Sequence, residues 1–224
     1  MKKLLKKALQ RIIPTRFDPI IVASMGRSGS TLVYDALCDG MAAARFGALK
    51  RFGRRIVGDT AWELSRQSFT PGVVYKTHDL PTELPRDCGA RVVFLFGRAS
   101  DAAMSVLSCR HRYGAAWVAE HFAHMRALGS FEELGERDVL RFEEQIDGWL
   151  AVGHARILGL RYETLWKHAD DLSRFVGFPV TLPDRRPRDG SKEIDLATAE
   201  KFTATYRALD EKIAGLADCI LRAG

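Results

Sequence analysis

The sequence contains few cysteines, and none of them stands at a spacing that binds a metal or forms a redox pair. Cys38, Cys88, Cys109 and Cys219 are scattered over 224 residues. Scattered cysteines are typical of reduced thiols in a cytosolic protein, so we expect neither a disulfide framework nor a bound metal. Apolar runs of roughly 20 residues, which span a bilayer, are also missing, as is a signal-peptide pattern. We therefore expect a cytoplasmic protein.

Acidic residues are absent before Asp18, whereas six basic residues occupy this stretch. They are Lys2, Lys3, Lys6, Lys7, Arg11 and Arg16. The formal net charge is +6, so the remaining chain is neutral overall. A nucleic-acid-binding protein carries basic residues over the body of its fold, which argues against a nucleic-acid partner. Since no linker composition divides the chain, we predict a basic segment at 1–16 and a single domain at 17–224.

Residues 2–13 have the pattern of an amphipathic helix, which Pro14 ends. Leucine, isoleucine and alanine side chains fall on one face, and the lysines and Arg11 fall on the other. The pattern fits a helix docked on its own domain with its lysines in water. It also fits a helix on a membrane surface, which would put the protein at the membrane periphery.

Apolar runs and segments of helical periodicity alternate along the rest of the chain. The runs predict strands at 19–24, 55–57, 73–76, 91–96 and 157–162. The periodic segments predict helices from Ser30 and at 61–67, 100–112, 115–128, 137–152, 164–176 and 196–221. Strands that alternate with helices predict an α/β fold. We expect a central parallel sheet flanked by helices, a three-layer sandwich like that of P-loop NTPases.

A glycine-rich turn joins the first predicted strand to the helix that follows it. The turn consists of Gly26, Arg27, Ser28, Gly29, Ser30 and Thr31. Glycines let successive N–H groups point at an anion, and the helix N-terminus adds partial positive charge. In a Walker A loop a lysine would stand where this chain has Ser30, and an aspartate would end a later strand to hold Mg²⁺. The turn therefore predicts a phosphate-type donor that reacts without a metal.

Several segments of the chain form an ordered set of motifs. They are GRSGSTL at 26–32, YKTH at 75–78, FLFGRASDAAMS at 94–105, LRYETL at 160–165 and PRDGSK at 187–192. In these motifs and their order, the chain from residue 19 to about residue 192 resembles the sulfotransferases that use 3′-phosphoadenosine 5′-phosphosulfate (PAPS). The resemblance implies PAPS as donor, adenosine 3′,5′-bisphosphate (PAP) as product, and no required metal.

Residues 76–78, at the end of the strand predicted at 73–76, carry the predicted chemistry. His78 is predicted to be the general base, because an imidazole accepts a proton near neutral pH. Lys76 lies two residues earlier on the strand, so it points the same way and would stabilise charge on the leaving oxygen. Arg27 would share that task on the 5′-phosphate and the sulfuryl group.

The resemblance also implies a site for the nucleotide part of the donor. Ser105 and Arg98 would bind the 3′-phosphate, and Tyr162 would contact adenine. Arg98 stands one position later than the arginine of the family, so other arginines are alternatives to it. These are Arg110, Arg112 and Arg188. In the late loop, Arg188 and Gly190 would complete the site.

The acceptor is expected to lie against the helices predicted near 113–128 and 137–152, because no other segment is left to contact it. His121 and His124 are interpreted as surface or groove residues, and Trp117 as core. We predict sulfuryl transfer to a hydroxyl or amine of a small molecule, glycan or lipid. Two alternatives remain open: a P-loop kinase of small substrates, and a non-catalytic membrane-associated protein with the same fold.

Overall fold

A computed structural model describes residues 3–185 and 194–224 of the chain. Six strands form one sheet: β1 (Ile20–Ser24), β2 (Gly58–Thr60), β3 (Val74–Lys76), β4 (Arg91–Phe96), β5 (Arg156–Arg161) and β6 (Cys219–Arg222). The α-helices are α1 (Lys3–Ile12), α2 (Ser30–Phe46), α3 (Lys50–Val57), α4 (Ala99–Met125), α5 (Phe142–Ala151), α6 (Ala169–Val176), α7 (Leu196–Thr205) and α8 (Arg207–Ala214). Short 3₁₀ turns are η1 (Gly47–Leu49), η2 (Leu64–Arg66), η3 (Pro81–Glu83), η4 (Glu132–Gly135) and η5 (Tyr162–His168).

The strands lie in the order β2-β3-β1-β4-β5-β6, and all neighbours from β2 to β5 are parallel. The prediction of an α/β fold with a central parallel sheet is thus confirmed. The edge strand β6 runs antiparallel to β5, and we had expected helix up to Leu221. That expectation was wrong because the helical pattern ends with α8, and the short apolar run after it pairs with the open edge of β5.

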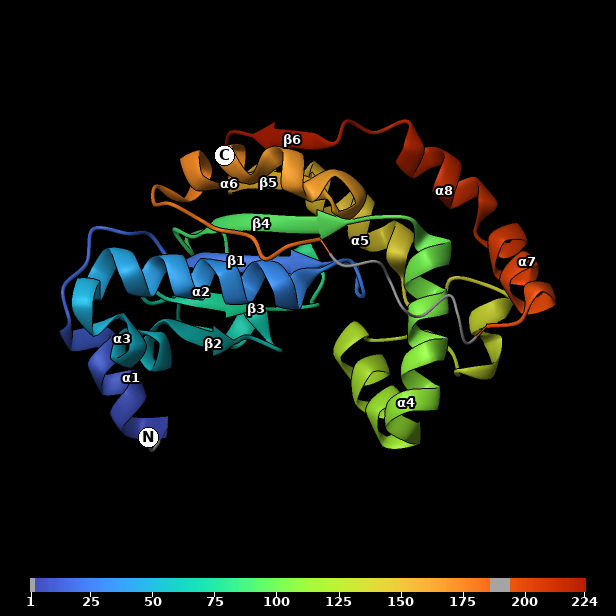
Figure 1. Ribbon diagram of the computed structural model, residues 1–224, viewed down its shortest axis with the longest axis horizontal. Coiled ribbons are helices and arrows are strands. Elements are labelled where there is room, and N and C mark those ends of the chain that lie inside the picture. The colour runs from blue at the N-terminus through green and yellow to red at the C-terminus, as the bar shows by residue number, and fades with distance from the viewer. Residues whose placement is uncertain (1–2, 186–193) are drawn as a thin grey trace.

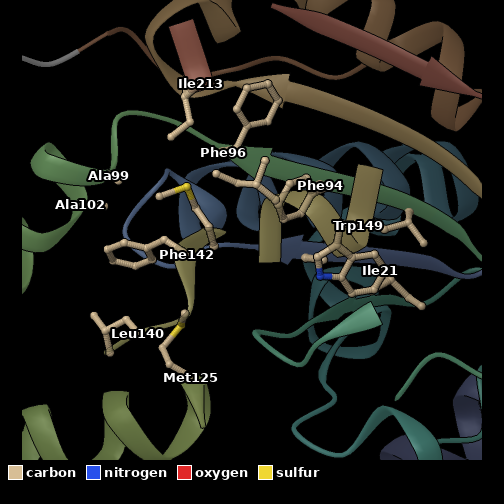
Figure 2. Close-up of a cluster of buried hydrophobic side chains, with 14 of the residues drawn as sticks. Ile21, Phe94, Phe96, Ala99, Ala102, Met125, Leu140, Phe142, Trp149 and Ile213 are labelled. Atoms are coloured by element: carbon tan, nitrogen blue, oxygen red, sulfur yellow. The ribbon is translucent and has the colours of Figure 1, made fainter. Parts of the chain in front are cut away.

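Alternate residues of the buried strands enter two separate hydrophobic clusters, one on each face of the sheet. On β4, Val92, Phe94 and Phe96 pack with α4, α5 and α8 (Figure 2). Val93 and Leu95 of the same strand pack with α2 and α6. Because both faces are covered by helices, the fold has the three layers predicted from the sequence.

Two predictions for the segment between β1 and β3 were wrong. Residues 50–57 form helix α3, although 55–57 was expected to be a strand. Ile56 and Val57 are β-branched, but they are buried beside the four basic residues of an amphipathic helix, and pairing with β3 begins only at Gly58. The helix expected at 61–67 is reduced to the 3₁₀ turn η2.

The predicted helices at 100–112 and 115–128 are two halves of α4, which is kinked at Gly114. Gly114 has a φ of 81°, a value at which glycine is strongly favoured. The carboxyl ends of β1, β3 and β4 point toward the side of the molecule where α4 stands (Figure 1). In doubly wound α/β folds ligands bind at this edge of the sheet. In the described part of the chain, every helix is too short or too polar to cross a membrane.

Candidate active site

A cleft of about 460 Å³ opens at the carboxyl edge of the sheet. Its walls come from the phosphate loop (residues 26–31), the end of β3 and the second half of α4. The lining residues are Arg27, Gly29, Ser30, Thr31, Leu32, Trp62, Lys76, His78, Ser105, Trp117, Glu120, His121, His124 and Tyr162. The structure therefore brings most of the predicted site residues to one cavity.

The phosphate loop is curled into a concave turn by residues with positive φ. Gly26, Arg27 and Gly29 have φ values of 88°, 50° and 86°. Backbone turned in this way directs successive N–H groups to one side, and Gly29 is also the N-cap of α2. A Cβ at Gly29 would lie 2.5 Å from Cδ2 of Tyr162, so only glycine fits there. The loop can therefore bind an oxyanion close to its backbone.

Two cationic side chains face this turn. Nε of Arg27 donates to Oγ of Ser105 at 3.0 Å, and the guanidinium lies 5.6 Å from the ring centre of Trp117. Nζ of Lys76 donates to Oγ1 of Thr31 at 2.7 Å. Burial, together with the charge of Arg27, lowers the pKa of Lys76. Because an approaching anion would counter both effects, the pair is suited to hold one.

The side chain of Ser28 is buried under the loop and is bonded to the neighbouring strand. The hydroxyl of Ser28 donates to the carbonyl oxygen of Leu95 at 2.9 Å, and Ser28 is buried. This hydroxyl therefore joins the loop to β4, and binding of an anion by Ser28 stays a prediction. Ser30 and Thr31 do line the cleft.

His78 is buried at the end of β3, where its backbone and its ring are both held. Nδ1 lies 3.0 Å from Oγ of Ser24 and 3.4 Å from the carbonyl oxygen of Ser24. Nε2 of Gln145 on α5 donates to the carbonyl oxygen of His78 at 2.6 Å. Burial, with smaller contributions from His121 and Lys76, lowers the pKa of His78 to about 3. The imidazole is therefore neutral at physiological pH, and the tautomer with hydrogen on Nδ1 leaves Nε2 able to accept a proton.

The second half of α4 forms a wall of the cleft, in the segment where the sequence predicted contact with an acceptor. Trp117, Glu120, His121 and His124 follow one another at helical spacing along the same face and all line the cleft. Trp117 had been interpreted as core, whereas His121 and His124 had been interpreted as surface or groove residues. The signal that could have found the wall is this run of polar and aromatic residues at i, i+3, i+4 and i+7.

Ring stacking connects this wall to the opposite side of the cleft. Trp117 stacks on His121 with centroids 4.9 Å apart, and Trp62 stacks on His124 at 4.0 Å. The ring of His78 lies between these pairs, 5.6 Å from Trp62 and 6.0 Å from His121. His121 is only 7% exposed, and its Nε2 has no hydrogen-bond partner among the described residues. A buried imidazole nitrogen of this kind is available to a bound substrate.

The residues predicted for the nucleotide are brought together only in part. Ser105 and Tyr162 line the cleft. Arg98 lines a separate cavity of about 470 Å³, where its Nη2 lies 3.7 Å from Oδ2 of Asp210. Arg188 and Gly190 lie outside the described residues. The arginine expected beside Ser105 thus has an acidic partner in the other cavity.

Potential metal ligands gather at a place other than the cleft. His168, Asp171 and Cys219 form one group whose ligand atoms lie within 4.8 Å of one another. Nδ1 of His168 is 2.9 Å from Oδ2 of Asp171, so these two side chains already form a hydrogen bond with each other. The four cysteines, Cys219 included, are free thiols.

Known protein-family models give no match to this chain, and curated protein sequences give none either. The chain is similar to the structure of retinol dehydratase in complex with androsterone and inactive cofactor PAP, with 14% identity, a TM-score of 0.49 and coverage of 96% of this chain and 86% of that chain. It is similar to mouse sulfotransferase SULT7A1 complexed with PAP, with 13% identity, a TM-score of 0.41 and coverage of 96% and 72%. A third similar structure is the sulfotransferase domain of the Synechococcus PCC 7002 olefin synthase, with 14% identity, a TM-score of 0.40 and coverage of 93% and 99%.

Proposed function

We propose that this protein is a sulfotransferase that moves the sulfuryl group of PAPS to a hydroxyl or amine of an acceptor. The proposal rests on one observation: Lys76 and His78, two residues apart at the end of β3, line the same cleft as the phosphate loop. A cradle for an oxyanion and a neutral buried base therefore share one cavity, which is what transfer between a phosphosulfate and a hydroxyl needs.

The residues of the cleft fit the donor. The concave backbone turn of the phosphate loop, the hydroxyls of Ser30 and Thr31, and the cations Arg27 and Lys76 would hold the 5′-phosphosulfate. Ser105 and Tyr162 would contact the nucleotide. PAPS supplies the sulfuryl group and leaves as PAP. Arg27 and Lys76 are positioned to stabilise the negative charge that develops on the leaving phosphate.

His78 would take the proton of the acceptor on Nε2 while Nδ1 stays in contact with Ser24. A base with a pKa of about 3 is weak, but its low pKa comes mainly from burial and from the neighbouring His121 and Lys76. A bound anion favours the protonated imidazole and raises that pKa. The donor would therefore make His78 a stronger base at the moment when both substrates are present.

The unpartnered Nε2 of His121 and the carboxylate of Glu120 are polar groups of the α4 wall, and both residues line the cleft. Both would contact the acceptor or the transferring group. A small molecule, a glycan and a lipid headgroup all remain compatible with a cleft of about 460 Å³ lined by rings and polar atoms.

Thermal unfolding in the presence of nucleotides tests the donor. PAP at about a hundred times its dissociation constant should stabilise the native state by about 2.7 kcal/mol without added metal. AMP, which lacks the 3′-phosphate, should stabilise it less at the same concentration. Stabilisation by ATP with Mg²⁺ and not by PAP would overturn the proposal in favour of a kinase. Stabilisation by PAP without PAPS turnover on a panel of phenols, sugars and amines would favour a non-catalytic binding protein.

A further inference from the structure

Helix α1 docks on the domain through its polar side. Nε2 of Gln10 donates to the carbonyl oxygen of Ile56 on α3 at 2.7 Å, and Gln10 is only 4% exposed. Nζ of Lys6 lies 3.6 Å from Oδ1 of Asp59. An amphipathic helix that packs on its own domain normally buries its apolar stripe. Helix α1 is turned the other way, which differs from the docked arrangement expected from the sequence and is compatible with the membrane-surface arrangement.

Much of the apolar face of α1 is left uncovered by the described residues, although Leu9 and Ile13 at its edge are half-buried. Leu4 is 85% exposed, Leu5 is 55% exposed and Ile12 is 73% exposed. Together with Ala8, these side chains fall within an arc of about 100° around the helix axis. Leu49 and Phe52, in η1 and α3, are exposed as well. Large exposed apolar side chains are thus concentrated at the end of the molecule where α1 and α3 pack together (Figure 1).

The charge at this end of the molecule has one sign. Helices α1 and α3 carry four basic residues each and no acidic residue. Five of these cations are exposed and form no ion pair with another residue that the structure describes. They are Lys7, Arg11, Lys50, Arg51 and Arg55. Around the helix axis, Lys7 and Arg11 lie next to Leu4, at one edge of the exposed apolar face. The apolar face is therefore bordered by positive charge.

We propose that α1 and the adjoining α3 bind the surface of an anionic phospholipid membrane. Leu4, Leu5 and Ile12 would enter the boundary between headgroups and acyl chains, and the cations would contact anionic headgroups. A second copy of the chain is disfavoured as the occupant, because two such faces would bring like charges together. Binding at this end leaves the cleft free, since the cleft lies at the carboxyl edge of the sheet near α4 (Figure 1).

Sedimentation with lipid vesicles tests the proposal. The full chain should bind vesicles of phosphatidylcholine mixed with phosphatidylserine, and should bind pure phosphatidylcholine at least about tenfold more weakly. Raising the salt from about 0.1 M to about 1 M should weaken binding, because the charge contacts are screened. The triple variant Leu4→Gln/Leu5→Gln/Ile12→Gln should lose at least about tenfold in affinity. Lys7→Gln/Arg11→Gln should lose about fivefold for each cation removed.

A matched control comes from three exposed leucines elsewhere, Leu128, Leu196 and Leu221, which are 61%, 74% and 66% exposed. Their triple replacement by glutamine should leave vesicle binding unchanged. All variants should keep the unfolding temperature of the parent, since no buried group is altered. Equal binding of neutral and anionic vesicles, or no binding to either, would overturn the proposal. A dimer seen by analytical ultracentrifugation that is abolished by the α1 triple variant would instead identify this face as a self-association surface.

Discussion

The two sides of the cleft are held in place by different kinds of contact. On the strand-end side, directed hydrogen bonds fix each group: Lys76 bonds to Thr31, and His78 lies against Ser24. On the helix side, formed by the second half of α4, Trp117 and His124 are held mainly by ring stacking. Hydrogen bonds depend steeply on geometry, whereas stacked rings tolerate sliding. In the proposed function, the strand-end side would fix the donor and the base, and the helix side would adapt to an acceptor.

Removing the proposed base, His78, should have the largest effect and should separate the two sides of the cleft most clearly. We expect His78→Ala to lower the rate of sulfuryl transfer by about 10²–10⁴-fold, because a positioned general base contributes about that much. PAP should still raise the unfolding temperature, since His78 is not part of the phosphate loop. His154→Ala is the control, because His154 lies outside the cleft beside the carbonyl oxygen of Leu84. An unchanged rate in His78→Ala would mean that another group takes the proton.

A methyl group in the phosphate loop should have the next largest effect. Gly29→Ala puts a Cβ at 2.5 Å from Tyr162 and forces alanine into a φ of 86°. Gly177→Ala is a matched control, with a φ of 84° and nothing within 4 Å of its Cβ. Each should lose about 1–2 kcal/mol of stability from backbone strain. Only Gly29→Ala should also lose most of its stabilisation by PAP, measured by thermal unfolding. Equal PAP responses of the two variants would exclude the loop as the anion site.

The strand-end side was predictable from sequence, because its geometry is local. Gly26 and Gly29 stand between a strand and a helix, and that context alone indicates an anion-binding turn. Lys76 and His78 are two residues apart on a strand, so their common direction follows from the strand period. The helix side was predictable only as a segment near 113–128, and not side chain by side chain. Whether Trp117 and His121 face core or cleft depends on the kink at Gly114 and on what α4 packs against, and only the tertiary structure supplies this.

The same reasoning explains the other differences between prediction and structure. Ser28 offers a hydroxyl in the right segment, but its direction is decided by a carbonyl of β4 that is distant in sequence. Arg98 is drawn toward Asp210, more than a hundred positions later. Strand β6 depends on the open edge of β5 rather than on its own pattern. In each case the deciding partner comes from another part of the chain.

Acid should weaken the fold through the imidazoles that meet across the cleft. The pKa values of His78 and His121 are lowered by burial to about 3, whereas an unfolded histidine has a pKa of about 6.5. Below about pH 6.5 the unfolded state therefore binds more protons, so stability is full above that pH and is lost as the pH falls toward 3. Denaturant unfolding should show His121→Asn to be less acid-sensitive, by up to about 1.4 kcal/mol per pH unit. Parallel pH profiles of the variant and the parent would mean that burial does not lower the pKa of His121 in the folded protein.

The smallest expected effects concern the nucleotide end, where Ser105 lines the cleft and Arg98 does not. Ser105→Ala should weaken the binding of PAP by about 1 kcal/mol, or roughly fivefold in Kd, because one hydrogen bond is lost. Arg98→Gln should change Kd by less than about 0.5 kcal/mol. Comparing PAP with AMP decides how Ser105 acts. A loss confined to PAP would indicate direct contact with the 3′-phosphate, whereas a loss for both would indicate that Ser105 acts by positioning Arg27. Weaker binding of PAP by Arg98→Gln, with unchanged binding of AMP, would mean that Arg98 leaves Asp210 and contacts the 3′-phosphate. The two cavities would then form one site.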